Sequence, residues 1–354
     1  GTAGDIVAFA DYAATWQTYN VTVTPNGTDK IGSLNTSAVL STEGQSVTFV
    51  FVDSTQGWIN TMDSTSNVRG EIPFIAATGG TITTVCTDYK VHTFTGPGTF
   101  TVTNAGTPAG SDTVDYMVVA GGAAGACMSL CGSTVGGGGG AGGYRFSAST
   151  YTSPPTASPL AGSALPVSAT AYSIVVGAGS GNARPPVNGS NSSFSTIASA
   201  GGGNAGGASG GPRAGGSGGG GKASASCGQP GGVGNTPPTS PAQGTGGGSG
   251  VAPTKGGGGG GALVDGGGGT SKGGNGIDLN ITGSPVTKGG GGGGANGTNP
   301  VGGDGGGGTG SPNATSSGTA GTINTGGGGG GSGHSGGNGG SGGSGIVIIR
   351  YKFQ

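Results

Sequence analysis

The stretch GGGGGGALVDGGGGTSKGGNG, residues 256–276, shows the pattern from which most of this chain is built: runs of pure glycine alternate with short inserts that carry the side chains. Two further runs of six glycines, residues 289–294 and 326–331, begin 33 and 37 residues after the run before them. A period of about 20 to 50 residues is typical of a repeat architecture, in which each unit buries its contacts against its neighbours.

Glycine runs of this length favour one extended conformation. A polyproline II helix rises about 3.1 Å per residue with about three residues per turn and makes no internal hydrogen bonds. Every N–H and C=O therefore needs a partner on a neighbouring chain, and a Cβ would block that approach. We predict a sandwich of packed polyglycine II helices with polar loops over residues 121–345, rather than the flexible linker that Gly/Ser-rich sequence usually forms.

Two apolar segments flank the glycine-rich region. Asp115–Ala120 precedes it, and the closing segment 346–354 begins with the apolar residues Ile346–Ile349. A linker has no reason to end in a strand, and an apolar strand needs a partner. We therefore predict that the closing strand pairs with Asp115–Ala120 and closes the domain on itself.

Residues 1–88 predict a separate β-rich domain for oligomerisation or attachment, because β-branched and aromatic segments alternate there with turn signals such as Pro25–Asp29. A small β-sandwich or barrel-like fold is expected, and residues 89–120 are connecting strands that begin the second domain. Trp16 and Trp58 are predicted core residues, with an exposed Trp58 contacting sugar as the alternative. The expected strands are Ile6–Phe9, Tyr19–Thr24, Ser46–Val52 and Lys90–Phe94.

Charge and glycine are unevenly distributed. Only 13 of the 95 glycines lie in residues 1–120, which carry a net charge of −7, whereas residues 121–354 carry +6. The formal net charge of −1 and the 7% of charged residues lack the basic footprint of a nucleic-acid binder. Either two unlike folds have unlike surfaces, or the basic half faces an anionic cell surface such as lipopolysaccharide or a capsule.

Signals for a metal, a cofactor, catalysis or membrane insertion are absent from the sequence. The four cysteines lack the paired spacing of a zinc site, and the chain has only two histidines. Cys127 and Cys131, four apart in a flexible segment, are near enough to form a disulfide, with isolated buried thiols as the alternative. No apolar run approaches the ~20 residues of a membrane helix. We expect a protein that is not an enzyme and is not inserted in a membrane.

The segments Gly98–Thr103, Tyr116–Gly122 and Gly345–Tyr351, together with the glycine runs, resemble the glycine-rich domain of phage tail-fibre proteins. Related in architecture are the tail-fibre tip adhesins of T-even-type phages, whose polyglycine sandwich carries receptor-binding loops. The resemblance covers about residues 90–354, although the longer, irregular inserts before Ala200 depart from it.

The first domain carries a second resemblance. Asn20–Ile31, Ser46–Val52 and Gly57–Trp58 resemble β-rich modules of phage tail fibres, which commonly form homotrimers. The two resemblances together imply a location on the virion surface, outside the cell. They also imply a host cell-surface glycan or outer-membrane protein, and other virion tail proteins, as partners.

The inserts between glycine runs are the expected receptor-binding loops, and short and long inserts are expected at opposite ends of the sandwich. A structural or decorating virion protein is the main alternative, and an ice-binding or matrix protein is a third. The sequence leaves open which end faces the receptor. The candidate contact residues are Leu263, Asp265, Asp278, Asn280, Thr282, Asn299, Asn313, Thr315 and His334.

Overall fold

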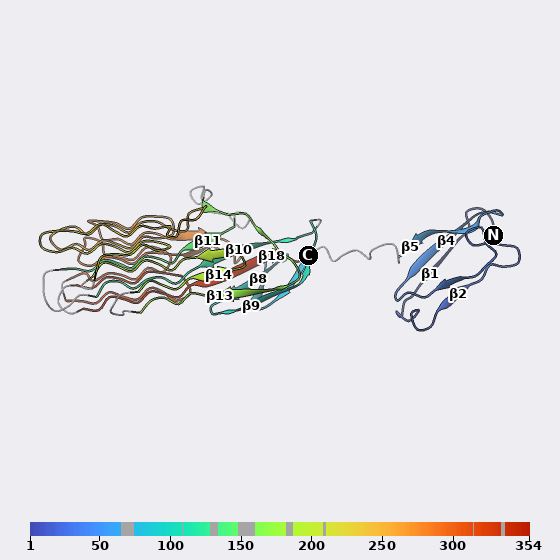
Figure 1. The fold of residues 1–354 in the computed structure, drawn as a ribbon, viewed down its shortest axis with the longest axis horizontal. Coiled ribbons are helices and arrows are strands. Elements are labelled where there is room, and N and C mark those ends of the chain that lie inside the picture. The colour runs from blue at the N-terminus through green and yellow to red at the C-terminus, as the bar shows by residue number, and fades with distance from the viewer. Residues whose placement is uncertain are drawn as a thin grey trace. The chain divides into compact units, whose positions relative to one another are not determined.

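The computed structural model describes residues 1–64, 74–108, 110–127, 134–147, 160–181, 187–207, 210–313, 315–333 and 337–354 (Figure 1). The chain divides into two compact units, Gly1–Ile72 and Pro73–Gln354. All regular secondary structure in the described residues is β-strand, which confirms the predicted mainly β class. Within those residues there is also no helix that would reach across a membrane.

The first unit contains a three-stranded sheet and a hairpin. The sheet has the order β1-β4-β5 and the hairpin pairs β2 with β3. Leu40, Val47 and Phe49 form its buried core, and the partly buried Trp16 and Trp58 pack against them. The strands are β1 (Ile6–Ala10), β2 (Val21–Val23), β3 (Ala38–Leu40), β4 (Ser46–Asp53) and β5 (Gly57–Asp63).

The second unit begins with a sandwich of two antiparallel sheets. One has the order β11-β10-β18-β8-β7, with β12 beside β10, and the other has the order β15-β14-β13-β9-β6. A separate hairpin joins β16 to β17. The strands are β6 (Ile75–Thr78), β7 (Thr81–Val85), β8 (Tyr89–Phe94), β9 (Gly98–Ala105), β10 (Thr113–Val119), β11 (Tyr144–Phe146), β12 (Leu165–Pro166), β13 (Ala171–Val175), β14 (Ser192–Phe194), β15 (Ile197–Ser199), β16 (Ile277–Leu279), β17 (Val286–Lys288) and β18 (Ile346–Lys352).

The division between the units falls earlier than the expected boundary at residue 88. β6 pairs with β9 and β7 pairs with β8, so both strands belong to the sheets of the second unit. Their short lengths and turn-rich surroundings resemble those of the first unit. Only the pairing partners distinguish them, and these lie later in the sequence.

The closing strand β18 pairs with β10 as the flanking apolar segments predicted, with Tyr116 opposite Ile349. On its other side β18 pairs with β8, so it lies in the centre of its sheet. Both faces of that sheet are covered, which explains why β18 is apolar almost throughout. The face carrying Tyr116 and Ile349 packs against the second sheet, and the face carrying Ile348 packs against β16 and Ala262.

From the sheets the glycine runs extend as parallel and antiparallel rods (Figure 1). Residues 136–143 form a central rod whose hydrogen bonds repeat every third residue. The amides of residues 138–143 donate, in order, to the carbonyl oxygens of Gly257, Gly329, Gly203, Gly260, Gly326 and Ala200. Amides three residues apart therefore bond to the same neighbouring run, which is 256–261, 326–331 or 200–206. This repeat of three residues is the one expected for a polyglycine II helix.

The carbonyl groups of the central rod point to three further neighbours. The oxygens of residues 136–141 accept, in order, from the amides of Ala295, Ala126, Gly220, Gly292, Ala123 and Ser217. Donors and acceptors together give this rod six hydrogen-bonded neighbours, an arrangement that leaves little room for side chains, and Ala141 is its one residue with a Cβ. A Cβ built on Gly139 would overlap the carbonyl of Ala123, and one built on Gly259 would overlap the carbonyl of Gly139.

Candidate functional site

The turns between rods lie at two ends of the glycine bundle. The strand end adjoins the sheets, where Ala262 packs beside Tyr144 in the core. At the opposite end, the far end, Val135, Ala223 and Ala295 form a small cluster between rods. We call the following the far-end turns: residues 223–228, 251–255, 268–272, 295–300, 311–313 and 315–317 (Figure 1).

Short and long inserts are not segregated as the sequence led us to expect. The short insert 262–265 lies at the strand end, whereas the short insert 295–301 lies at the far end. The long insert 277–288 forms the hairpin β16–β17 at the strand end. Insert length therefore does not decide the end at which a turn lies, because each insert closes whichever pair of rods it joins.

Two candidate residues at the strand end hold local structure. Leu263 is half-buried and packs against the core beneath the sheet. The exposed Asp265 accepts a hydrogen bond at 2.7 Å from the amide of Gly246 on a neighbouring rod. Both side chains thus help to fix the turn 262–265 in place.

Three more candidate residues lie in the hairpin insert at the strand end. Asp278 and Asn280 are half-buried, and their Oδ1 atoms find no hydrogen-bond partner among the described residues. The carbonyl of Asn280 accepts from Nη1 of Arg350 at 3.3 Å, and Thr282 donates to the carbonyl of Ser284 at 3.1 Å. This insert is therefore tied to the sheet.

The other described candidates lie at the far end and are exposed: Asn299, Asn313 and Thr315. Oδ1 of Asn313 accepts from the amides of Thr315 and Ser316 at 3.0 and 2.9 Å, an Asx-type turn that orders its loop. His334 lies outside the described residues. The structure thus separates the candidates into five at the strand end and three at the far end.

Charge is separated along the bundle, which the sequence showed only as a difference between halves. Acidic residues after Asp115 are Asp265, Asp278 and Asp304, and all three lie at the strand end. Asp304 is placed there by its carbonyl, which accepts from the amide of Gly276 just before β16.

The far end carries the opposite charge. Lys222, Lys255 and Lys272 lie in or beside its turns and are partly exposed. Only the ammonium of Lys222 has a polar contact among the described residues, at 3.1 Å from the carbonyl of Gly207. Sequence reasoning missed these lysines, since their grouping depends on how the rods are paired. The far end is therefore a set of exposed polar turns with positive charge only.

Lys288 provides a contrast at the strand end. Its ammonium donates to the carbonyl of Asn324 at 3.0 Å, and burial lowers its pKa. Lys288 is therefore held by the fold, whereas Lys255 and Lys272 are partly exposed and have no polar contact among the described residues.

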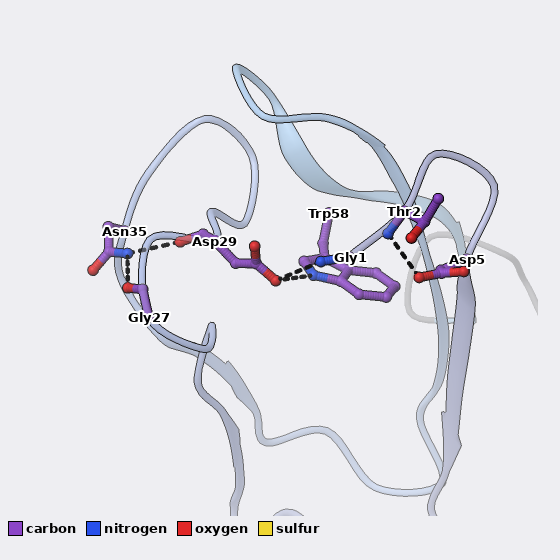
Figure 2. Close-up of polar contacts among 7 residues, drawn as sticks. All are labelled: Gly1, Thr2, Asp5, Gly27, Asp29, Asn35 and Trp58. Carbon is purple, nitrogen blue, oxygen red and sulfur yellow. Dashed lines mark hydrogen bonds and ion pairs between the residues drawn. The ribbon is translucent and has the colours of Figure 1, made fainter.

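The first unit contains an apolar cavity of about 200 Å³ beside Trp58. Asp29 lines this cavity. Its Oδ2 accepts from Nε1 of Trp58 at 3.4 Å and pairs with the ammonium of Gly1 at 3.1 Å (Figure 2). The hydrogen bond from that ammonium is the main cause that lowers the pKa of Asp29. Trp58 also packs edge-on against Phe51, so most of the indole serves the core as predicted.

Neither the cysteines nor the acidic residues form a metal site in the described part of the chain, where no group of three or more metal-ligating side chains comes together. Sγ of Cys127 lies 3.6 Å from Oδ1 of Asn338. The predicted disulfide partner, Cys131, lies outside the described residues.

A model of a glycine-rich domain matches residues 94–352, from the last residue of β8 to the last residue of β18. The matched segment includes the central strand pair and all the glycine rods. No curated protein matches the chain.

Proposed function

The chain belongs to the glycine-rich domain family, and from this premise we propose that it is a phage tail fibre or tail-fibre tip adhesin. Its far-end turns bind a receptor on the host cell surface. The observation that carries this proposal is the separation of charge, with Lys222, Lys255 and Lys272 in or beside the far-end turns and the acidic residues at the strand end. The work of this protein is binding, not catalysis.

Rigidity of the bundle supports a binding role. Loops held on a rigid scaffold are common carriers of binding function, because the scaffold fixes their positions before the partner arrives. Here each central rod is held by hydrogen bonds to its neighbours at every residue, so adjacent turns keep their spacing. Side chains can vary in the turns without disturbing the rods, since the rods are held together by hydrogen bonds between their backbones.

Positive charge at the far end favours an anionic receptor. A surface of one sign raises the local concentration of oppositely charged partners and speeds their association. Bacterial lipopolysaccharide and capsule carry such negative charge, so we propose an anionic cell-surface glycan ahead of an outer-membrane protein. Binding through exposed charges is screened by salt, with a Debye length of about 8 Å at physiological ionic strength.

The first unit is proposed to mediate self-association, as a homotrimer, and attachment to other virion tail proteins. β1 is an edge strand, and its Ile6 is 66% exposed, which leaves apolar surface and unpaired backbone for a partner strand. Sedimentation of the full chain tests this proposal. A trimer that dissociates in the variant Ile6→Lys supports it, and a monomer at all concentrations contradicts it.

The receptor proposal is tested by a matched pair of double variants. Lys255→Gln with Lys272→Gln removes two charges from the far end, and Lys90→Gln with Lys352→Gln removes two charges from β8 and β18, at the ends of these strands away from the rods. Binding of the full chain to immobilised lipopolysaccharides is measured at low and high salt. We expect the first pair to weaken binding about tenfold at low salt and the second to leave it nearly unchanged.

Other outcomes would count against the receptor proposal. Equal weakening by both double variants would show that net charge matters and the far end does not. No binding to any lipopolysaccharide or capsule would favour the alternative, a structural or decorating fibre protein of the virion whose turns contact neighbouring subunits.

A further inference from the structure

A second polar site lies at the strand end, where the edges of the two sheets meet. β11 is the edge strand of one sheet and β15 is the edge strand of the other. Beside them the loop 235–243 closes a pocket of about 240 Å³ whose walls include Arg145, Thr196 and Pro237. None of the loop residues predicted from the sequence contributes to it.

Strand alternation directs Arg145 away from the core beneath the sheet. Its neighbours Tyr144 and Phe146 are buried in that core, so Arg145 lies on the other face, where it is half-buried. Its guanidinium forms no ion pair or hydrogen bond with any described residue. The carboxylate of Asp115 lies on the opposite face of β10 and is paired with Arg350. Arg145 is therefore a cation whose charge the fold leaves unneutralised.

The loop that closes the pocket is fixed by buried hydrogen bonds. Gln243 is 1% exposed, its Oε1 accepts from the amide of Ala200 at 2.7 Å, and its Nε2 donates to the carbonyl of Pro237 at 2.8 Å. The backbone amide of Gln243 donates to Oδ1 of Asn235, which also accepts from the backbone amide of Thr239. The loop 235–243 is therefore ordered before any ligand binds in the pocket.

Two further polar groups remain available in the pocket. Oδ1 of Asn191 accepts from the amide of Gly201 at 2.9 Å, which orients the side chain and leaves its NH₂ group for a ligand. The hydroxyl of Thr196 has no hydrogen-bond partner among the described residues. Ala198 and the ring of Pro237 supply apolar wall between these groups. One cation, one amide donor and one hydroxyl therefore surround a small apolar surface.

We propose that this pocket binds a carboxylate-bearing monosaccharide unit, such as a hexuronate. The planar guanidinium of Arg145 matches a carboxylate in two parallel hydrogen bonds. The amide of Asn191 and the hydroxyl of Thr196 bind ring hydroxyls, and Pro237 contacts the C–H face of the sugar. This site is separate from the far-end turns and does not depend on their function.

The test is a titration of the full chain with glucuronate, glucose and acetate, followed by nuclear magnetic resonance or calorimetry. We expect glucuronate to bind at least about tenfold more tightly than glucose or acetate, because only glucuronate uses both the cation and the hydroxyl-binding groups. Equal binding of acetate and glucuronate would show that the pocket reads a carboxylate alone, as on a peptide, and would overturn the proposal. So would equal binding of glucose, or no binding of glucuronate.

Variants locate the binding. Arg145→Gln should weaken glucuronate binding about tenfold or more, and Arg145→Lys should weaken it less, because lysine keeps the charge but loses the planar fork. Arg213→Gln, the matched control, removes the same charge outside the pocket and should leave binding unchanged. If Arg145→Gln lowers the unfolding temperature, Thr196→Ala supplies the same test without changing charge. Unchanged affinity in both pocket variants would overturn the assignment.

Discussion

The hydroxyl of Tyr351 lies 3.1 Å from Nε2 of His92, an imidazole that is completely buried between the two sheets. Nδ1 of His92 lies 2.7 Å from the carbonyl of Gly79, which can only accept, so Nδ1 carries the proton and Nε2 accepts from the tyrosine. The tyrosine oxygen in turn accepts from the amide of Ala77 at 3.1 Å. One neutral imidazole thus links the closing strand to β8 and to the opposite sheet.

Acidification should destabilise the second unit through His92. Burial is the main cause that lowers its pKa, so below the unfolded value of about 6.5 the unfolded chain binds more protons than the folded chain. Stability should therefore fall as pH drops from 7.5 to 5, measured by denaturant unfolding. In the variant His92→Gln the unfolding free energy should fall less steeply between pH 7.5 and 5. An unchanged dependence on pH would contradict the assignment.

Removing the hydroxyl of Tyr351 should leave two buried polar groups without a hydrogen-bond partner. Tyr351→Phe leaves Nε2 of His92 and the amide of Ala77 without their partner, which should cost about 1–3 kcal/mol of unfolding free energy. Tyr172→Phe is the control, because that hydroxyl bonds to the exposed Ser168. Similar losses of unfolding free energy in the two variants would show that the buried hydrogen bonds of Tyr351 contribute no more to stability than the exposed one of Tyr172.

Adding one methyl group to a central rod should be strongly destabilising. Gly139→Ala places a Cβ on the carbonyl of Ala123, and relief requires moving a hydrogen-bonded rod, so we expect a loss of about 3 kcal/mol. Gly181→Ala meets nothing within 4 Å and should be neutral or slightly stabilising. Thermal unfolding compares the two, and equal unfolding temperatures would argue against packed glycine rods.

The buried pair of Asp115 and Arg350 should make stability depend on pH in the opposite direction. Burial is the main cause that raises the pKa of Asp115, and Arg350, 3.7 Å away, partly offsets it. Arg350→Met should cost about 3 kcal/mol at pH 7, since it leaves a buried carboxylate unpaired. Because the folded pKa lies above the unfolded value, this loss should shrink as pH falls towards 4. The double variant with Asp115→Asn should recover most of it at pH 7.

At the far end, the side chain of Asn313 should keep its turn ordered. Asn313→Ala removes the acceptor for the amides of Thr315 and Ser316, and should raise hydrogen exchange at both amides while global stability changes by less than about 1 kcal/mol. Asn313→Asp keeps the oxygen and should keep the protection. Unaltered exchange in the alanine variant would contradict this role.

The sequence by itself determined the strands that flank the glycine-rich region, the segments that form rods, and that β18 closes the domain on β10. It did not predict the short strands β11 to β17, which lie within the region expected to contain only rods and loops. The physical reason is that an apolar strand at the end of a glycine-rich chain has few partners, and that runs without Cβ atoms can pack closely on all sides. For the candidate loops, the sequence identified the inserts between glycine runs and the difference in charge between the halves, but not which inserts are exposed.

The tertiary structure alone decided the register of the rods, the end at which each turn lies, the placement of β6 and β7 in the second unit, and the pocket beside Arg145. A glycine carries no side chain to distinguish one neighbour from another, so the same run can pair with any rod. Its partners are fixed only when every N–H and C=O in the bundle is paired at once. The grouping of Lys255 and Lys272 at the far end follows from that pairing, and no local pattern records it.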